Sequence, residues 1–172
     1  IASGARPLIP RIEGLEEAGY LTSQTVWDLT KKPGSMIIVG GGFVAVEFAH
    51  FFSSIGTDVT LLSRSRRLIK QAEPEVSELL ELAMSRRMNI VTNVEVVDAR
   101  KGGSLKEVEA VDAETGERTK FAAEELFIAS GRRSNADLVR PEKTGVELDE
   151  RGFIKVNDFL ETTKPRIWAF GD

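Results

Sequence analysis

The feature that most constrains the fold is a glycine-rich turn between a short apolar run and a longer amphipathic segment. Residues 36–39 read MIIV, and the next residues read GGGFVA. An apolar, largely β-branched run without alternation is typical of a strand that is buried on both faces. From Phe43 to Ile55, apolar residues recur at spacings of three and four and Gly56 follows, which predicts an amphipathic helix. The sequence therefore predicts a strand, a tight turn and a helix in direct succession.

The small residues of this turn have the spacing of the G-x-G-x-x-G/A fingerprint, at Gly40, Gly42 and Ala45. Gly40 would permit the tight turn, Gly42 would let the backbone approach a pyrophosphate, and Ala45 would let the helix pack closely on the strand. The unpaired amides at the helix N-terminus would bind the pyrophosphate. Any tight strand-to-helix turn favours glycine, but the strand and helix on either side favour a dinucleotide site over a turn without a ligand.

The segment after this helix bears on which dinucleotide is bound. In such folds an acidic residue about 20 positions on, at the end of the second strand, binds the adenosine ribose. Asp58 is near that count but begins the predicted strand 58–62, and Ser63 follows its end. Four cations come next: Arg64, Arg66, Arg67 and Lys70. A solvated basic loop would explain the charge but not the missing acid, whereas a 2'-phosphate would explain both. The sequence therefore favours NADP(H) over NAD(H).

The rest of the chain predicts an α/β fold. Residues 8–21 have no sustained periodicity and indicate a surface connection, and residues 22–29 predict a short helix capped by Thr22 or Ser23. A second helix is expected over 74–87. From residue 89, short alternating runs with a Glu-Thr-Gly-Glu turn predict an antiparallel layer, before a last apolar strand over 125–130. We therefore expect a Rossmann-like FAD/NAD(P)-binding domain, with a parallel sheet flanked by helices and an antiparallel β-meander insert.

Composition excludes several classes of protein. The 172 residues, 41% hydrophobic, can bury one core of ordinary domain size. A net charge of −4 argues against nucleic acid or an anionic membrane as partner. The sequence has no cysteine, so it forms no disulfide, thiolate metal site or cysteine nucleophile. It also has no apolar run of about 20 residues, and we expect a cytoplasmic protein without a metal site.

Four stretches carry a resemblance to a known family. IASGARPLIP at 1–10 is similar to an A-T-G-x-x-P segment, and GGGFVAVEFA at 40–49 is similar to a nicotinamide-nucleotide motif. LFIASGRRSN at 126–135 resembles an A-x-G-R-x-P-N segment, and the final IWAFGD resembles a flavin-contacting motif. Together and in this order they resemble the flavin-dependent pyridine nucleotide-disulfide oxidoreductases, the family of dihydrolipoamide dehydrogenase and of glutathione, mercuric and mycothione reductases.

The resemblance implies a domain organisation. Residues 1–10 would end a first flavin-domain segment, 11–134 would form the NAD(P)H-binding domain, and 135–172 would return toward the flavin domain. The chain would then be the nicotinamide-nucleotide domain of a longer, homodimeric protein that contains FAD and a dimerisation domain.

The resemblance also assigns roles to single residues. Arg64 and Lys70 would hold the 2'-phosphate, and Phe43 matches an aromatic residue that covers the nicotinamide pocket. Glu47 matches an acid that lies beside the nicotinamide and pairs with a lysine of the flavin domain; a plain helix-surface carboxylate is the alternative. The remaining cofactor-binding candidates are Gly40, Gly42, Ala45, Ser63, Arg66, Gly131, Arg132 and, for the flavin, Asp172.

Departures from the family pattern limit what this chain could do alone. Ser134 stands where the family has proline, and Ser3 where it has threonine. The sequence contains no C-x-x-x-x-C redox pair, no first flavin fingerprint and no His-Glu pair of the dimerisation domain. We therefore expect the isolated chain to be inactive as a disulfide reductase. A non-catalytic nucleotide-sensing module and an NAD(P)H:flavin oxidoreductase without a redox disulfide remain as alternatives.

Overall fold

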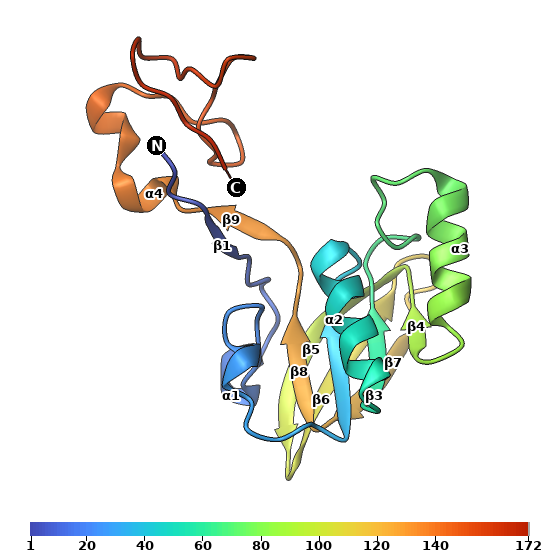
Figure 1. Ribbon diagram of the computed structural model, residues 1–172. Helices are drawn as coiled ribbons and strands as arrows, with labels where there is room; N and C mark the ends of the chain where they lie inside the picture. Colours follow the sequence, from blue (N-terminus) through green and yellow to red (C-terminus); the bar gives the residue numbers. More distant parts are fainter. Residues whose placement is uncertain (172) are drawn as a thin grey trace. The chain divides into compact units, whose positions relative to one another are not determined.

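A computed structural model describes residues 1–171, which belong to two compact units (Figure 1). One unit consists of Ile1–Leu8 and Arg132–Asp172, and the other of Ile9–Gly131. Asp172 lies outside the described residues. The unit Ile9–Gly131 contains the glycine-rich turn and is called the core unit below; the other is called the terminal unit.

A four-stranded parallel sheet forms the centre of the core unit. Its strands are β2 (Ser35–Val39), β3 (Asp58–Leu62), β4 (Asn89–Val91) and β8 (Glu125–Ile128), in the order β4-β3-β2-β8. All three pairings are parallel, and Val39 pairs with both Leu62 and Ile128. The carboxyl ends of β3, β2 and β8 therefore lie together at one edge of the sheet.

The two faces of this sheet are covered by different layers. Helices α2 (Phe43–Ser54) and α3 (Pro74–Met84) cover one face (Figure 1), where Met36 and Ile38 pack with Ala45 and other buried residues. The alternate residue Ile37 belongs to a second apolar cluster together with Val108 of the antiparallel layer. The strand β2 is thus buried on both faces, as its unalternating apolar run predicts.

The antiparallel layer consists of β5 (Val94–Gly102), β6 (Leu105–Asp112) and β7 (Arg118–Ala123). The strands pair in the order β5-β6-β7, and the predicted Glu-Thr-Gly-Glu turn joins β6 to β7. The expected α/β fold, with a parallel sheet and an antiparallel meander, is therefore confirmed. The meander occupies the face that a further helical layer would cover in a doubly wound fold.

Two expectations for the segment before β2 are wrong. Residues 8–21 are more than a surface connection, because α1 (Leu15–Ala18) buries Leu15 and Ala18 in the second apolar cluster. The predicted helix over 22–29 is reduced to the single 3-10 turn η1 (Val26–Asp28). The predicted cap at Thr22 is present, since its Oγ1 accepts the Gln24 amide and Thr25 Oγ1 accepts the Thr22 amide, as in a capped helix start. The helix does not continue because Leu29 is already extended, with ψ +119°, shortly before Pro33.

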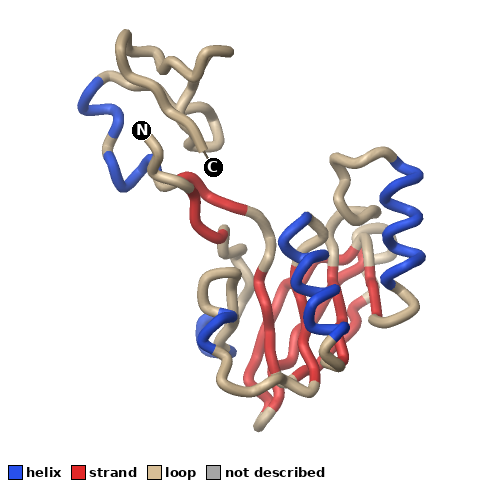
Figure 2. Tube along the Cα trace, viewed as in Figure 1, coloured by secondary structure: helices blue, strands red, loops and turns tan. Residues whose placement is uncertain are grey.

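The terminal unit is built from short elements. Strand β1 (Ala5–Pro7) pairs antiparallel with β9 (Arg132–Ser134), and α4 (Ala136–Val139) and η2 (Pro141–Thr144) follow. Beyond them the chain is mostly loop, as Figure 2 shows, with isolated bridges such as Leu148–Ile154. Among the described residues no helix is long and apolar enough to cross a bilayer.

Candidate functional site

The glycine-rich turn lies where β2 leaves the sheet. The Gly40 amide donates a hydrogen bond of 2.9 Å to the Leu62 carbonyl, and Gly40 has a φ of +144°. A Cβ at this position would lie 2.7 Å from the carbonyl carbon of Ala129 and still closer to its oxygen. Only glycine fits both the backbone angle and the close approach to the residue that follows β8.

Gly42 differs from Gly40 because its surroundings are open. It is the N-cap of α2, in an extended conformation with φ −91° and ψ −175°, and no side chain caps the helix. A Cβ at Gly42 would have no neighbour within 4 Å. The first helical bond runs from Val46 to the Gly42 carbonyl, so the amides of the first turn face a space that an anion can enter.

Ala45 holds the helix against the sheet. It is fully buried and belongs to the cluster that includes Met36 and Ile38 of β2. This agrees with the third position of the fingerprint, where a small residue allows close packing of helix and strand.

Gly41, which the sequence reasoning did not single out, carries its own constraint. A Cβ there would lie 3.0 Å from the Ser63 Cβ and closer to its hydroxyl. The run of three consecutive glycines in the sequence could have indicated that Gly41 is constrained as well. Gly41 thus lets the turn after β2 and the turn after β3 lie against each other.

The basic loop after β3 is anchored by its apolar residues. Leu68 is fully buried and Ile69 nearly so. The Ile69 amide donates a 2.7 Å hydrogen bond to the Gly41 carbonyl, and its own carbonyl accepts the amide of Ala72. Ile69 has a φ of +45°, which is uncommon for a β-branched residue. The loop is therefore folded back onto the glycine-rich turn.

The cations of this loop have different environments. Arg64, Arg66 and Lys70 are exposed, and Arg67 is half-buried. Arg64 forms an ion pair of 3.9 Å with Glu95, and Arg66 forms one of 2.5 Å with Glu114. Both acids belong to the antiparallel layer, and no local sequence pattern connects them with the loop. The sequence reasoning missed them for that reason.

Ser63 has a structural environment. Its side chain is buried, with 1% of the residue exposed. Its hydroxyl accepts the Ser65 amide at 3.2 Å and lies at the same distance from the Ser65 carbonyl. In this conformation the Ser63 hydroxyl is bonded within the turn, and its predicted contact with the nucleotide stays a prediction.

Asp58 lies where the sequence predicted it. It pairs with Ser35 at the beginning of β3, whereas Leu62 pairs with Val39 beside the glycine-rich turn. The acid nearest in count to the ribose-binding position is thus at the opposite end of the strand.

Phe43 and Glu47 are both exposed on α2, one helical turn apart. Both side chains therefore lie on the same exposed side of α2, in its N-terminal half. Gly131, with φ +128°, is the last residue of the core unit. Arg132 belongs to the terminal unit, where its guanidinium donates to the Ala5 carbonyl at 2.7 Å. The predicted flavin contact Asp172 lies outside the described residues.

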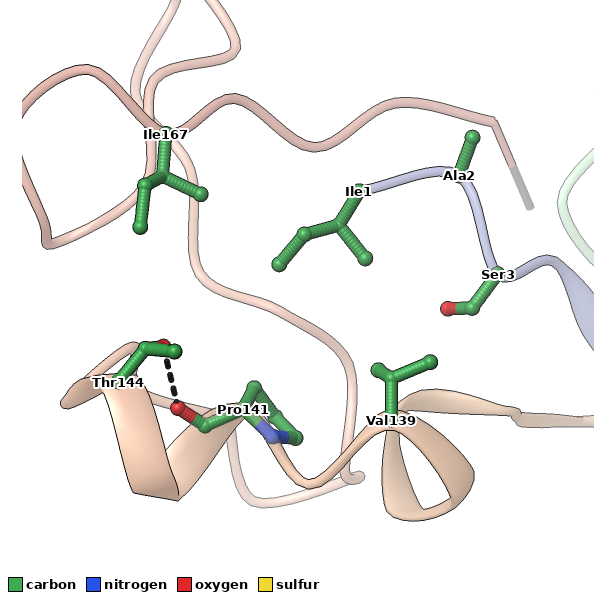
Figure 3. Close-up of a pocket in the computed structure, with 7 residues that line it drawn as sticks. All are labelled: Ile1, Ala2, Ser3, Val139, Pro141, Thr144 and Ile167. Carbon is green, nitrogen blue, oxygen red and sulfur yellow. Dashed lines mark hydrogen bonds between the residues drawn. The ribbon is translucent and has the colours of Figure 1, made fainter.

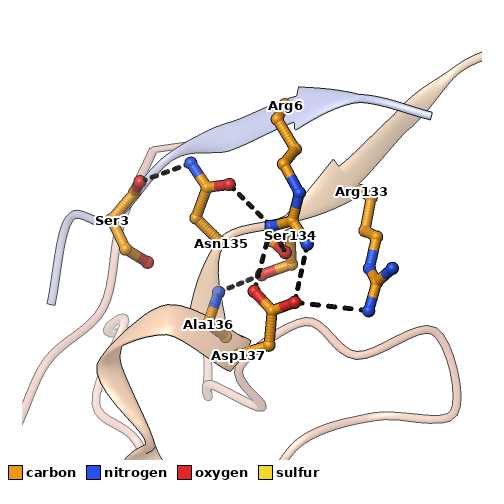
Figure 4. A network of polar contacts seen from close by, with 7 residues as sticks. All are labelled: Ser3, Arg6, Arg133, Ser134, Asn135, Ala136 and Asp137. Carbon is orange, nitrogen blue, oxygen red and sulfur yellow. Dashed lines mark hydrogen bonds and ion pairs between the residues drawn. The ribbon is translucent and has the colours of Figure 1, made fainter. Parts of the chain in front are cut away.

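A polar network organises the terminal unit around the segment RRSN (Figure 4). Arg6 donates to Asp137 Oδ2 at 2.6 Å, to Asn135 Oδ1 at 2.9 Å and to the Ser134 carbonyl at 3.1 Å. Arg133 adds a second ion pair with Asp137 at 3.2 Å. The hydrogen bond from Arg6 lowers the pKa of the Asp137 carboxyl, and the same bond raises the pKa of Arg6.

Ser134 and Asn135 in this network hold backbone groups. The Ser134 hydroxyl accepts the Ala136 amide, and the Asn135 side chain donates to the Ser3 carbonyl at 3.0 Å. These contacts give the segment RRSN a structural role in joining the two ends of the terminal unit.

A cavity of about 460 Å³ also lies in the terminal unit (Figure 3). Its lining is mainly apolar: Ile1, Ala2, Ser3, Val139, Pro141, Thr144 and Ile167. The Thr144 hydroxyl is already bonded to the Pro141 carbonyl. None of the predicted nucleotide-binding residues lines this cavity. The described residues contain no group of acidic or histidine side chains arranged to bind a metal ion.

Comparison with known proteins agrees with these features. The family model of the pyridine nucleotide-disulphide oxidoreductases matches residues 1–172. The mercuric reductase of Lysinibacillus sphaericus is 35% identical over 173 residues, which cover 100% of this chain and 31% of that protein. The mycothione reductase of Mycobacterium tuberculosis is 35% identical, with 100% of this chain and 36% of that protein covered.

A solved structure has the same fold. The HOCl-induced flavoprotein disulfide reductase RclA of Escherichia coli superposes with a TM-score of 0.87 at 29% identity, covering 99% of this chain and 38% of that one. The chain spans about a third of the length of the curated relatives it matches. The resemblance inferred from the four sequence stretches is confirmed.

Proposed function

Because this chain belongs to the pyridine nucleotide-disulphide oxidoreductase family, we propose that its core unit binds NAD(P)H within an FAD-dependent disulfide oxidoreductase. In this proposal the chain contributes the binding and orientation of the nicotinamide nucleotide. When bound, FAD would exchange a hydride with the nicotinamide, and the redox-active disulfide would come from residues outside this cysteine-free sequence.

The observation that carries this proposal is the open N-terminus of α2. Gly42 has space where a side chain would be, and the helix has no capping side chain. A pyrophosphate placed there would accept hydrogen bonds from the amides of the first turn, and the helix dipole would favour its negative charge. The site also lies at the carboxyl edge of a parallel sheet, where ligands of open α/β folds bind.

The basic loop supports a preference for NADP(H). Arg64 and Lys70 are exposed on a loop that is bonded to the glycine-rich turn through Ile69 and Gly41. The residue at the end of β3 is the buried Ser63 rather than a carboxylate. A 2'-phosphate would find cations in this region and no acid at the end of β3 to repel it.

Phe43 and Glu47 are proposed to act at the nicotinamide end of the site. Phe43 has 59% of its surface exposed at the first turn of α2, so its ring can rest on an apolar ligand face. Glu47, one turn further along, would orient the nicotinamide or a cation beside it. Both would position the ring without taking part in covalent chemistry.

The described residues fit a nicotinamide nucleotide better than they fit FAD. Among them, α2 is the one helix of eight residues or more that begins at a glycine-rich turn; α3 begins with Glu73 and Pro74. FAD would therefore be held mainly by other parts of the protein, with the terminal unit contributing contacts at most.

Titration of the chain with NADPH and NADH, followed by calorimetry or by nicotinamide fluorescence, tests the proposal. We expect both nucleotides to bind and NADPH to bind more tightly. The absence of binding by either nucleotide would overturn it. Flavin absorbance of the protein that contains this chain provides the second test. A colourless protein that binds nucleotide would instead support a nucleotide-sensing module.

A further inference from the structure

We propose that Glu95 and Glu114 are counter-ions of the basic loop that set how strongly the site prefers a nucleotide with a 2'-phosphate. This inference rests on the proposed function and assigns a selectivity role to the antiparallel layer. The two acids act through Arg64 and Arg66, so they are positioning residues rather than ligands of the nucleotide.

The ion pairs bring together residues far apart in the sequence. Glu95 lies on β5 and Glu114 on the turn between β6 and β7, whereas both arginines follow β3. Arg66 Nη2 lies 2.5 Å from Glu114 Oε1, a direct charge-assisted contact. Arg64 Nη1 lies 3.9 Å from Glu95 Oε1, a looser pair. All four side chains remain more than half exposed, so an incoming phosphate can reach the arginines.

Backbone hydrogen bonds hold the loop beside the acids. The Val94 amide donates to the Ser63 carbonyl at 3.0 Å, and the Asn93 amide donates to the Ser65 carbonyl at 3.2 Å. The Ala113 amide in turn donates to the Asn93 carbonyl at 2.9 Å. The main chains that carry the arginines and the acids are therefore linked, and the ion pairs do not depend on side-chain reach alone.

The turn that carries Glu114 is itself ordered by Asp112. One carboxylate oxygen of Asp112 accepts the amides of Thr115 and Glu114, each at 2.8 Å. These bonds, the Thr115 amide first, lower the pKa of the Asp112 carboxyl. The Asp112 carboxylate thus orders the turn from which Glu114 contacts Arg66.

A 2'-phosphate and the two acids would compete for the same guanidinium groups. Arg66 keeps other N–H donors free while Nη2 contacts Glu114, but a phosphate bound to it would lose the paired donor and meet the negative charge of Glu114. NADH has no phosphate at this position, so it does not disturb either pair. The acids should therefore weaken NADPH binding selectively and leave NADH binding nearly unchanged, which narrows the difference in affinity between the two nucleotides.

The test measures the Kd of NADPH and of NADH for the chain and for Glu114→Gln, Glu95→Gln and the double variant. Exposed ion pairs suggest that each neutralisation tightens NADPH binding by roughly 1.5- to 5-fold, with the larger effect for Glu114. The ratio of the two affinities is the readout, since a change in folding would move both nucleotides together. Glu114→Asp, which keeps the charge, should return the ratio toward that of the parent chain.

Glu117→Gln is the matched control. It lies on the same exposed turn and changes the net charge equally, and the described residues show no ion pair between Glu117 and the loop arginines. In Glu117→Gln the ratio of the NADPH affinity to the NADH affinity should stay at the value of the parent chain. In an Arg66→Ala background, Glu114→Gln should lose its effect.

The outcomes separate the two proposals. If the chain binds nucleotide but the ratio is the same in Glu114→Gln and Glu117→Gln, the counter-ion role is wrong and the proposed function stands. A fall in NADPH affinity in Glu114→Gln would likewise contradict the role. If the parent chain binds neither nucleotide, the proposed function fails and this inference fails with it.

Discussion

The backbone amide of Ile69 donates a hydrogen bond of 2.7 Å to the carbonyl of Gly41. This single contact joins the glycine-rich turn, where a pyrophosphate would bind, to the basic loop, where a 2'-phosphate would bind. Buried Leu68 and the close approach of Gly41 to Ser63 reinforce it. The separation of the glycine-rich turn and the basic loop, the two proposed phosphate-binding regions, is therefore set by the backbone.

Gly40→Ala should destabilise the fold strongly. The new Cβ would overlap the carbonyl of Ala129, and the φ of +144° is unfavourable for alanine. We expect a loss of about 2 kcal/mol or more in the free energy of unfolding, measured by urea denaturation. Gly103→Ala is the control, because Gly103 also has a positive φ but has open space around it; it should cost only about 1 kcal/mol. Equal losses in the two variants would contradict the steric role of Gly40.

Gly42→Asp should separate folding from nucleotide binding. The extended backbone of Gly42 suits a residue whose side chain caps the helix. The free energy of unfolding of the variant should therefore stay within a few tenths of a kcal/mol of the parent value or rise slightly. The carboxylate would occupy the pyrophosphate site and repel it, weakening both nucleotides by roughly 10- to 100-fold. Gly42→Asn, a cap without charge, should show a smaller loss. Unchanged Kd values in Gly42→Asp would place the nucleotide elsewhere.

Arg64→Ala and Lys70→Ala should each weaken NADPH by about 10-fold and leave NADH nearly unchanged, because a charged hydrogen bond to the 2'-phosphate is lost. Arg86→Ala is the matched control, since Arg86 is an exposed cation just beyond the C-terminal end of α3. Calorimetric titration with both nucleotides measures the effect. An equal loss in Arg86→Ala would show that long-range charge, and not these side chains, attracts the nucleotide.

Asp137→Asn should reduce stability in a pH-dependent manner. The hydrogen bond from Arg6 lowers the pKa of Asp137 in the folded state. A carboxyl group whose pKa is lower in the folded than in the unfolded state stabilises the fold at pH values above its unfolded pKa. This stabilisation is lost as the pH falls through the folded pKa. The loss in the free energy of unfolding caused by Asp137→Asn should thus be largest at pH 7 and should shrink below about pH 4, as measured by urea denaturation at several pH values. Arg6→Ala should lose the same pH-dependent stability and, in addition, a pH-independent part from its bonds to Ser134 and Asn135. A deficit that is constant with pH would argue against the ion pair.

Local patterns in the sequence predicted most of the core unit. The spacing around Gly40, Gly42 and Ala45 predicted the strand, turn and helix, and the switch to alternating runs after Met88 predicted the antiparallel layer. Short elements were predicted less well. In η1 the cap at Thr22 is present, but the chain becomes extended at Leu29, and the local sequence pattern does not show how early the turn ends.

The partners within the site could not be predicted in the same way. Glu95 and Glu114 reach Arg64 and Arg66 only because the meander packs beside the end of β3, and no spacing in the sequence records that contact. The left-handed Ile69 is also invisible in a sequence, since a β-branched residue disfavours that conformation. The candidate residues could therefore be named from the sequence, whereas their pairing required the three-dimensional structure.

The antiparallel meander that covers one face of the sheet contains two kinds of residue that differ in how freely they can be substituted. Residues such as Val96 and Val108 face the core and tolerate little change in volume. Exposed acids on the same strands and turns can be replaced with small effects on folding. Under the proposed counter-ion role, single substitutions at positions 95 and 114 would change cofactor preference while the fold and the glycine-rich turn stay the same.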